Sequence, residues 1–397
     1  MKRIFLISIA IAAFASCSKT TPMYEPAEEI AITPVNANIT KAIMQTGEFK
    51  GQSFNVWSWF NPAPATSSIE TFQEGLDDGT TTPYVVEKPF IEKSNGKWGG
   101  QVAYFWPSAG SLVFAGYHAP ALTADDAVTY TFTENENKMV FSNVSAAKVG
   151  ATGYDEDIMY FNMTPSSYNK SSLNVSVDFK HALSWITVTL AKRVDPVIEA
   201  KITVKNVFFT NVVPTGTGTV SGSDPIEWVV DETKFTPDQE VKYIIGAPLI
   251  DASMEIDYDT VEEDGKTTYK TKLYTLDEYL FIPQDIKGHL CITYSVESTD
   301  HSEFTETYVV NLTKLKEGHA QTKWEPGKHY TYNLSIGTDE ITVTPNVGGW
   351  DAVGEDILIP LPEDWYDTPK DSDDDTTGDD DTTGDDTTGD DNTDGNE

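Results

Sequence analysis

The sequence predicts an all-β protein in which two β-sandwich domains follow one another and a disordered acidic tail ends the chain. Short runs rich in β-branched and aromatic residues recur throughout, separated by Gly, Pro, Asn and Asp. This spacing is typical of sandwiches and barrels. No stretch of helix length shows a convincing amphipathic period. Aromatic residues make up 11 % of the 397 residues, enough to build real cores.

A signal peptide, residues 1–17, opens the chain. Lys2 and Arg3 precede the apolar run Ile4–Ala13, which is too short to span a bilayer. Small residues then precede Cys17, as in a bacterial lipobox, with Phe14 in place of the usual leucine. We expect Cys17 to be acylated, with palmitate among its chains. The alternative is a plain secretory signal in which the cysteine stands by chance.

Two series of predicted strands follow a tether, residues 18–34, that ends in the apolar first strand. Val194-Asp195-Pro196 interrupts the pattern, so we place the N-terminal sandwich at 35–195 and the C-terminal sandwich at 196–366. The first series comprises Phe54–Phe60, Val102–Trp106, Leu112–Tyr117, Val128–Phe132, Ile158–Phe161, Leu173–Phe179 and His181–Leu190. The second comprises Ile202–Val204, Ile226–Val230, Val241–Ala247, Thr271–Ile282, His289–Val296, Thr305–Leu312 and Ile357–Leu361.

The best-defined element is a hairpin within Trp324–Trp350. A turn at Glu325-Pro326-Gly327 leads into a strand whose apolar residues alternate, and a second alternating strand follows. Period-two alternation predicts half-buried strands. One face carries Tyr330, Tyr332, Leu334 and Ile336 on the first strand and Ile341 and Val343 on the second.

No motif in the sequence predicts catalysis, a metal site or a cofactor. There is no His-Glu-x-x-His, Gly-x-Ser-x-Gly, P-loop or Cys-x-x-Cys, and the six histidines lack metal-ligand spacing. The glycine-rich segment 216–222 lacks a strand-then-helix context, so we interpret it as a flexible loop between strands. Cys291 has no basic neighbour and His181 lies among core residues, so a structural thiol and a hydrogen-bonded structural histidine are expected. The chain is therefore not predicted to be an enzyme.

The charge of the chain excludes one class of partner. The net charge is −36, and residues 371–397 hold 13 acidic residues and no Lys or Arg, which leaves −23 on the rest. Nucleic-acid binding needs clustered Lys and Arg, so no nucleic-acid partner is predicted. Residues 367–397 have almost nothing to bury and dense like charge, so we expect a disordered tail without a specific calcium site.

Two aromatic clusters allow two interpretations. Exposed aromatic rings could form a glycan-binding face. However, Trp57 and Trp59 lie two residues apart on one predicted strand and so share a face, which favours a core. The clusters are Trp57, Trp59 and Phe60, and Trp98, Tyr104, Phe105 and Trp106.

Five blocks resemble, in their order and spacing, the fimbrillin family of Bacteroidota, which comprises type V pilus subunits and related lipoproteins. Phe179–Val188, FKHALSWITV, resembles the most diagnostic motif of the family, Phe-x-His-x-Leu followed by an alternating strand. The other blocks are Asn38–Val56, Asp155–Phe161, Leu280–Ile286 and Trp324–Trp350. Together they cover about residues 28–361.

The resemblance implies transthyretin-like or immunoglobulin-like sandwiches on a lipoprotein carried to the outer membrane. In polymerising members, a protease cuts after a basic residue and removes the first strand, and the C-terminal strand of another subunit fills the groove. Lys41 stands at the position of the basic residue, where arginine is more usual, and could equally be an ordinary loop lysine. The first strand would include Ile30–Thr33, and the implied donor residues are Ile357, Leu358, Ile359 and Leu361.

The tail also resembles a modification site of Bacteroidota. Thr376, Thr382 and Thr387 each follow Asp and precede Thr, as in the Asp-Ser/Thr acceptor of O-glycosylation in these bacteria. A repetitive Asp/Thr sequence would also produce this pattern by chance.

Two functional hypotheses remain from the sequence. The first is a surface lipoprotein that acts in adhesion as a structural or accessory (tip or anchor) pilus subunit. Its partners would be other fimbrial subunits, the outer membrane and a host or bacterial surface ligand. The second is a monomeric, lipid-anchored glycan-binding protein that uses one aromatic face.

Overall fold

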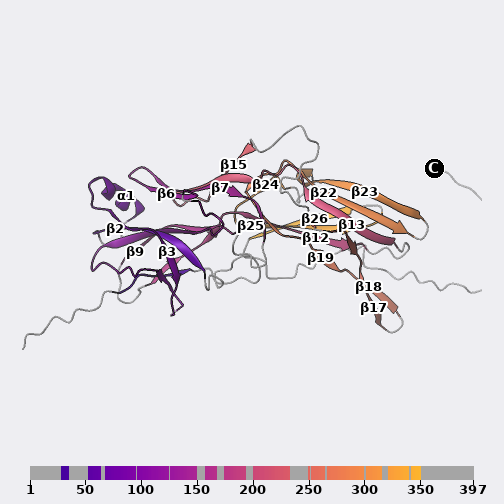
Figure 1. The fold of residues 1–397 in the computed structure, drawn as a ribbon, viewed down its shortest axis with the longest axis horizontal. Coiled ribbons are helices and arrows are strands. Elements are labelled where there is room, and N and C mark those ends of the chain that lie inside the picture. Colours follow the sequence, from indigo (N-terminus) through magenta and orange to yellow (C-terminus); the bar gives the residue numbers. More distant parts are fainter. Residues whose placement is uncertain are drawn as a thin grey trace, which may run out of the picture. The chain divides into compact units, whose positions relative to one another are not determined.

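The computed structural model describes residues 28–34, 52–63, 68–94, 96–124, 126–149, 157–167, 174–193, 200–232, 249–250, 252–263, 266–298, 301–314, 321–338 and 341–349. The chain divides into two units, Met1–Asp356 and Ile357–Glu397, and every described residue belongs to the first. Strands dominate this part, which confirms the predicted all-β class (Figure 1).

An eight-stranded sheet forms the framework of the N-terminal half, in the order β10-β1-β4-β3-β2-β5-β9-β11. Both of its faces are covered by apolar cores: Trp57 and Trp59 of β2 lie in one and Phe54 and Val56 in the other. Strand β5 is therefore buried at every residue. The strands are β1 (Ala31–Pro34), β2 (Ser53–Asn61), β3 (Thr82–Glu92), β4 (Trp98–Gly100), β5 (Ser111–His118), β9 (Met159–Ser167), β10 (Asn174–Val177) and β11 (Lys180–His181).

A four-stranded sheet, β15-β14-β7-β6, shares the core that holds Trp57 and Trp59. Its strands are β6 (Val128–Phe132), β7 (Asn137–Ser145), β14 (Thr215–Ser221) and β15 (Glu227–Val230). The same core takes Phe72 of α1 (Ile69–Asp77), a helix that the sequence analysis did not predict. At nine residues, α1 is too short to establish a helical period against the surrounding strand pattern.

Two further sheets enclose the core of the C-terminal half. In the first, β12 is buried along its whole length and pairs in parallel with β25 from Trp185 to Lys192. Its order is β26-β25-β12-β20-β8, with β19 also on β12. Its strands are β8 (Ala147–Lys148), β12 (Ser184–Lys192), β19 (Leu273–Thr275), β20 (Tyr279–Phe281), β25 (Lys328–Ile336) and β26 (Ile341–Gly349). The second sheet contains, in order, β16 (Met254–Ile256), β13 (Ala200–Phe209), β22 (His289–Ser298) and β23 (His301–Asn311).

Two short pairs and one 3-10 turn complete the described elements: β17 (Asp259–Glu263) with β18 (Lys266–Lys270), β21 (Gln284–Asp285) with β24 (Lys323–Trp324), and η3 (Leu312–Lys314).

The sheets do not separate at the predicted boundary between residues 195 and 196. Strand β12 precedes it but pairs with β20 and β25, whereas β14 and β15 follow it but extend the sheet of β6 and β7. Each half of the chain therefore contributes strands to the other. The reason is that β12 is buried on both faces and fits the centre of a sheet rather than the last position before a linker.

The Trp324–Trp350 hairpin is confirmed over β25 and β26, which pair from Lys328↔Gly349 to Ile336↔Ile341. The predicted strand at Val102–Trp106 is wrong. In this segment Phe105 forms one isolated bridge, to Glu29. The backbone of the segment bonds to the first residues of the described chain instead of extending a ladder.

The interpretation of residues 216–222 as a flexible loop is also wrong, because most of the segment is strand β14. Gly216 and Gly218 lie beneath the indole of Trp228 on β15. A Cβ at Gly218 would lie 2.9 Å from that ring, and a Cβ at Gly216 would lie 2.9 Å from Ile282 Cγ2, so both glycines serve close packing.

Replacing Gly218 with alanine is expected to destabilise the protein by about 1–3 kcal/mol through overpacking. The new Cβ would lie 2.8 Å from Ile226 Cδ1 and 2.9 Å from Trp228 Cζ2. Urea unfolding measures the loss. Ser221→Ala, an exposed change at the end of the same strand, should remain within about 0.5 kcal/mol of the parent. Equal stability of the two variants would contradict this packing.

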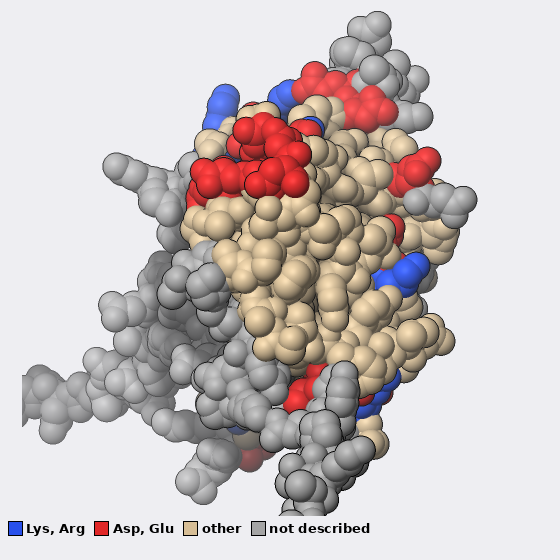
Figure 2. Space-filling view, turned by 90° about the vertical axis from the view of Figure 1, so that its left-hand side faces the viewer, with Lys and Arg blue, Asp and Glu red and all other residues tan. Residues whose placement is uncertain are grey.

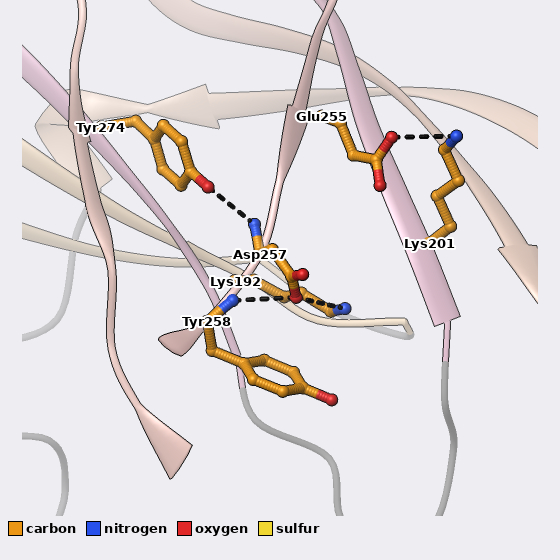
Figure 3. A network of polar contacts seen from close by, with 6 residues as sticks. All are labelled: Lys192, Lys201, Glu255, Asp257, Tyr258 and Tyr274. Atoms are coloured by element: carbon orange, nitrogen blue, oxygen red, sulfur yellow. Dashed lines mark hydrogen bonds and ion pairs between the residues drawn. The ribbon is translucent and has the colours of Figure 1, made fainter. Parts of the chain in front are cut away.

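The β17–β18 hairpin leaves the C-terminal half from a base fixed by polar contacts (Figure 3). Lys192 Nζ lies 3.3 Å from Asp257 Oδ1 and 4.5 Å from the centre of the Tyr258 ring. The Asp257 oxygen also accepts a hydrogen bond from Tyr258 N at 2.9 Å, and Asp257 N donates to the Tyr274 hydroxyl at 3.1 Å. These contacts hold the turn where the chain enters the hairpin.

Candidate functional site

The candidate site is the position of the first strand, β1, inside the eight-stranded sheet. Strand β1 runs parallel to β10, with Ala31 to Pro34 opposite Asn174 to Val177. On its other side it meets β4 in antiparallel fashion at one pair, Ile32↔Trp98. Among the described residues, the β1–β10 pair is the one parallel pair of this sheet.

Two isoleucines fix β1 in place. Ile30 and Ile32 are both 0 % exposed and belong to a core cluster rich in aromatic rings. Phe54 lies within this cluster, 5.2 Å from the ring of Phe179 and 6.5 Å from that of Trp98. Burying an isoleucine side chain stabilises a fold by about 1.5–3 kcal/mol, so these two residues contribute most of the attachment.

Backbone hydrogen bonds also hold the residues that precede β1. Ile30 N donates to Tyr104 O and Trp106 N donates to Glu28 O, both at 2.8 Å. Glu29 lies 3.8 Å from Lys93 Nζ in a partly exposed ion pair, which contributes little. Residues 28–34 therefore form one extended segment that bonds first to residues 104–106 and then to β10.

Three features make β1 less firmly held than an ordinary central strand. It shares one residue pair with β4, and Pro34 has no N–H to donate to the ladder. The Thr33 hydroxyl is buried with no hydrogen-bond partner among the described residues. A buried hydroxyl without a partner costs about 1–3 kcal/mol.

Replacing Thr33 with valine is expected to stabilise the protein by about 1 kcal/mol, because an isosteric methyl group replaces the unsatisfied hydroxyl. Thermal unfolding measures the change. Thr131→Val, an exposed site on β6, provides the matched control and should change stability by less than about 0.5 kcal/mol. A loss of stability in Thr33→Val would show that this hydroxyl has a partner.

Several predicted site residues lie outside the described residues. Lys41 belongs to the connection between β1 and β2, residues 35–52, of which only Gln52 is described. Cys17, the donor residues Ile357, Leu358, Ile359 and Leu361, and the tail residues Thr376, Thr382 and Thr387 also lie outside. Their roles stay predictions from the sequence.

The aromatic clusters are largely core, as the sequence favoured. Trp57, Trp59, Trp98 and Trp106 are each at most 8 % exposed. Phe105 differs, at 44 % exposed. These indoles are therefore not available as a glycan-binding face.

His181 and Cys291 are buried, as predicted. His181 Nδ1 lies 3.0 Å from Asp157 Oδ2, and both side chains are almost fully enclosed. Burial raises the pKa of the Cys291 thiol to about 11, so it stays protonated and weakly reactive at neutral pH. Both are structural groups.

Acidic side chains gather in separate groups on the face shown in Figure 2, beside a broad area without charge. Glu134 lies at the turn between β6 and β7. A hydrogen bond with Asp77 raises the pKa of Glu134, and repulsion from the negative charge of Asp77 raises this pKa further.

No group of three or more potential metal ligands occurs among the described residues. No helix in the described part is long and apolar enough to cross a membrane.

The sequence did not predict which strands lie beside β1. Val175 and Val177 of β10 lie in a run that was predicted as a strand, but nothing in the run indicates its partner. The pairing joins residues about 140 positions apart and in parallel, which alternation alone does not encode.

Comparison with known proteins gives a family and a fold. The model of the Fimbrillin-like family matches residues 51–350. A fimbrial protein from Bacteroides vulgatus is 18 % identical, with a TM-score of 0.50, over 81 % of this chain and 99 % of that chain. A candidate cell adhesion protein from Bacteroides uniformis is 13 % identical, with a TM-score of 0.40, over 81 % of this chain and 98 % of that one. The search of curated proteins gives no match.

Proposed function

Because this chain belongs to the fimbrillin-like family, whose model matches residues 51–350, we propose that it is a cell-surface fimbrial subunit that acts in adhesion. We further propose that it joins other subunits by exchange of the strand at the β1 position. Family membership supports a structural role rather than a catalytic one. The observation that carries the exchange mechanism is the short, incompletely paired β1, which is held by two buried isoleucines.

Loss of β1 would create a specific vacancy. The backbone groups of β10 and β4 that now pair with β1 would lose their partners, and the sockets of Ile30 and Ile32 would empty. An unpaired sheet edge is a template for another strand, and sockets for alternate side chains select which strand fits. The vacancy would therefore accept an extended segment with isoleucine-like side chains two residues apart.

The C-terminal segment of the same chain contains that pattern. Ile357-Leu358-Ile359 has the spacing of Ile30-Ala31-Ile32, and a proline follows within two residues in both cases. A donor in this register would place Ile357 and Ile359 in the two sockets. This likeness supports the assignment of Ile357, Leu358, Ile359 and Leu361 as donor residues.

Lys41 supplies a cleavage position compatible with this scheme. It lies between the end of β1 and the start of β2, so a cut after it separates β1 from the remaining chain without removing any other described strand. We propose that this cut precedes strand exchange.

Anchoring and modification are proposed from the sequence alone. Cys17 would carry the lipid that holds the precursor in the outer membrane, and Thr376, Thr382 and Thr387 would carry glycans. Intact-mass analysis of the uncleaved precursor tests the lipid, and intact-mass analysis of native protein tests the glycans. An unmodified mass of either form would contradict the corresponding modification.

Cross-linking of assembled material tests the register. In an Asn174→Cys, Leu358→Cys double variant, a short bismaleimide should join neighbouring subunits into a ladder that survives boiling in SDS, because Leu358 would take the place of Ala31, which lies opposite the exposed Asn174. Thr305→Cys with Leu358→Cys, where Thr305 is an exposed residue of β23, is the matched control and should give monomers. Equal ladders from both variants, or none from the first, would contradict the proposed register.

A further inference from the structure

A cleft of about 480 Å³ opens between the edge strand β15 and the β21–β24 pair. Its described walls include Trp228 and Val229 of β15 and the prolines Pro283 and Pro326. Small-molecule sites typically enclose about 300–1,000 Å³ and combine apolar walls with a few polar groups. None of the residues that hold β1 lines this cleft, so it is a separate feature.

Trp228 is held in a fixed position in the cleft wall. Its Nε1 donates a hydrogen bond to Ala182 O at 2.8 Å, and its ring lies over the glycines of β14. A Cβ on Gly218 would come within 2.9 Å of the ring, which is why this strand carries no side chain there. Because the indole is already ordered, a ligand would not have to immobilise it on binding.

Polar groups surround this ring. Asn211 has φ of 54°, a left-handed conformation that asparagine tolerates, and this residue lines the cleft. Glu227 and Lys323 also line it and make no side-chain hydrogen bond among the described residues. These groups are free to bind hydroxyl groups of a ligand.

The cleft is nearly neutral within a strongly acidic chain. Lys287 and Glu232 form an ion pair at 2.8 Å, and the other charged lining residues are Glu227, Asp285 and Lys323. The whole chain carries −36. A strongly charged ligand would therefore meet like charges on one wall or another, whereas an uncharged polar ligand would not.

We propose that this cleft binds a neutral saccharide. A pyranose ring presents an apolar C–H face, which matches the fixed indole of Trp228, and a rim of hydroxyls, which matches Asn211, Glu227 and Asp285. This site goes beyond the proposed strand exchange and does not depend on it.

Calorimetry on the full-length chain tests the proposal with neutral oligosaccharides as probes: lactose, maltotriose, cellotriose and mannotriose. At least one should bind with Kd of about 1 mM or tighter. Trp228→Ala should weaken that binding about tenfold. Asn211→Gly should weaken it several-fold, because glycine keeps the left-handed backbone and removes the amide.

Tyr308→Ala removes an aromatic ring that is 37 % exposed but does not line the cleft, and it should leave the affinity unchanged. If Trp228→Ala does not fold, Asn211→Gly and Glu227→Gln decide the question, since both change the cleft surface only. The proposal is overturned if the parent binds none of the four probes, if the cleft variants bind as tightly as the parent, or if sialylated lactose binds more tightly than lactose.

Discussion

Replacing Ile32 with alanine is expected to lower the free energy of unfolding by about 2–5 kcal/mol, the cost of emptying a buried isoleucine site. Ile32 is 0 % exposed and is the one residue through which β1 pairs with both β10 and β4. The loss should therefore release β1 and increase capture of a free donor peptide that spans residues 355–363. Urea unfolding and binding of the labelled peptide measure the two effects.

Val102→Ala provides the matched control for this prediction. Val102 lies near the same sheet, but it is 73 % exposed, so its truncation should change stability by less than about 0.5 kcal/mol and should not promote peptide capture. If Ile32→Ala captured no more peptide than Val102→Ala, the β1 position would not be the exchange site.

Lowering the pH from 7 to 4 is expected to destabilise the protein by about 3 kcal/mol through His329 alone. Burial lowers the pKa of His329 to about 4, against an ordinary value of 6.5. The unfolded chain therefore binds a proton that the folded protein excludes, and stability falls as the pH drops from 6.5 towards 4. Above pH 6.5 both states hold a neutral imidazole and the effect vanishes.

The surroundings of His329 explain why the charged form is disfavoured. Its ring stacks on Trp185 with centroids 3.6 Å apart, and its Nε2 lies 2.8 Å from Thr187 Oγ1. Thr187 donates its own hydrogen to Glu278, so the His329 ring donates to Thr187 as the neutral Nε2–H form. Burial also raises the pKa of Glu278, and the hydrogen bond from Thr187 opposes that rise.

A His329→Gln variant isolates this contribution from the titration of carboxylates. Urea unfolding of both proteins at pH 7 and pH 4 gives two pH-dependent losses, and the variant's loss should be smaller by about 3 kcal/mol. Parallel pH profiles would contradict a buried neutral His329.

The sequence predicted well the elements whose signal is local. The hairpin of β25 and β26 follows from two strictly alternating strands after a Pro-Gly turn, and β12 follows from the alternating strand within FKHALSWITV. The burial of Trp57 and Trp59 follows from their spacing on one strand. Each of these depends on neighbours in the chain, so periodicity alone is sufficient.

Features that depend on residues far away in the chain could not be predicted from periodicity. The glycines of β14 resemble a loop until the Trp228 ring that covers them is known. The parallel pairing of β1 with β10 joins the two ends of the N-terminal half, and β12 crosses into the other sandwich because its partners lie up to 150 residues later. Alternation determines that a segment is a strand but not which strand lies beside it.

The candidate site also has a part that the sequence predicts and a part that it does not predict. The apolar triplet Ile30-Ala31-Ile32 and the similar triplet Ile357-Leu358-Ile359 can both be read from the sequence. Only the structure shows that the first triplet belongs to a strand with one residue pair to β4 and that the Thr33 hydroxyl in this strand is unsatisfied. These details support the proposal that β1 is exchanged.

The most direct test of strand exchange is the mature N-terminus of native surface material, determined by mass spectrometry beside an unboiled SDS gel. Our account predicts a chain that starts directly after Lys41 and runs as a ladder of multimers that boiling dissociates. A chain that retains residues 28–34 and an acylated Cys17, and that runs as a single monomer band, would contradict it.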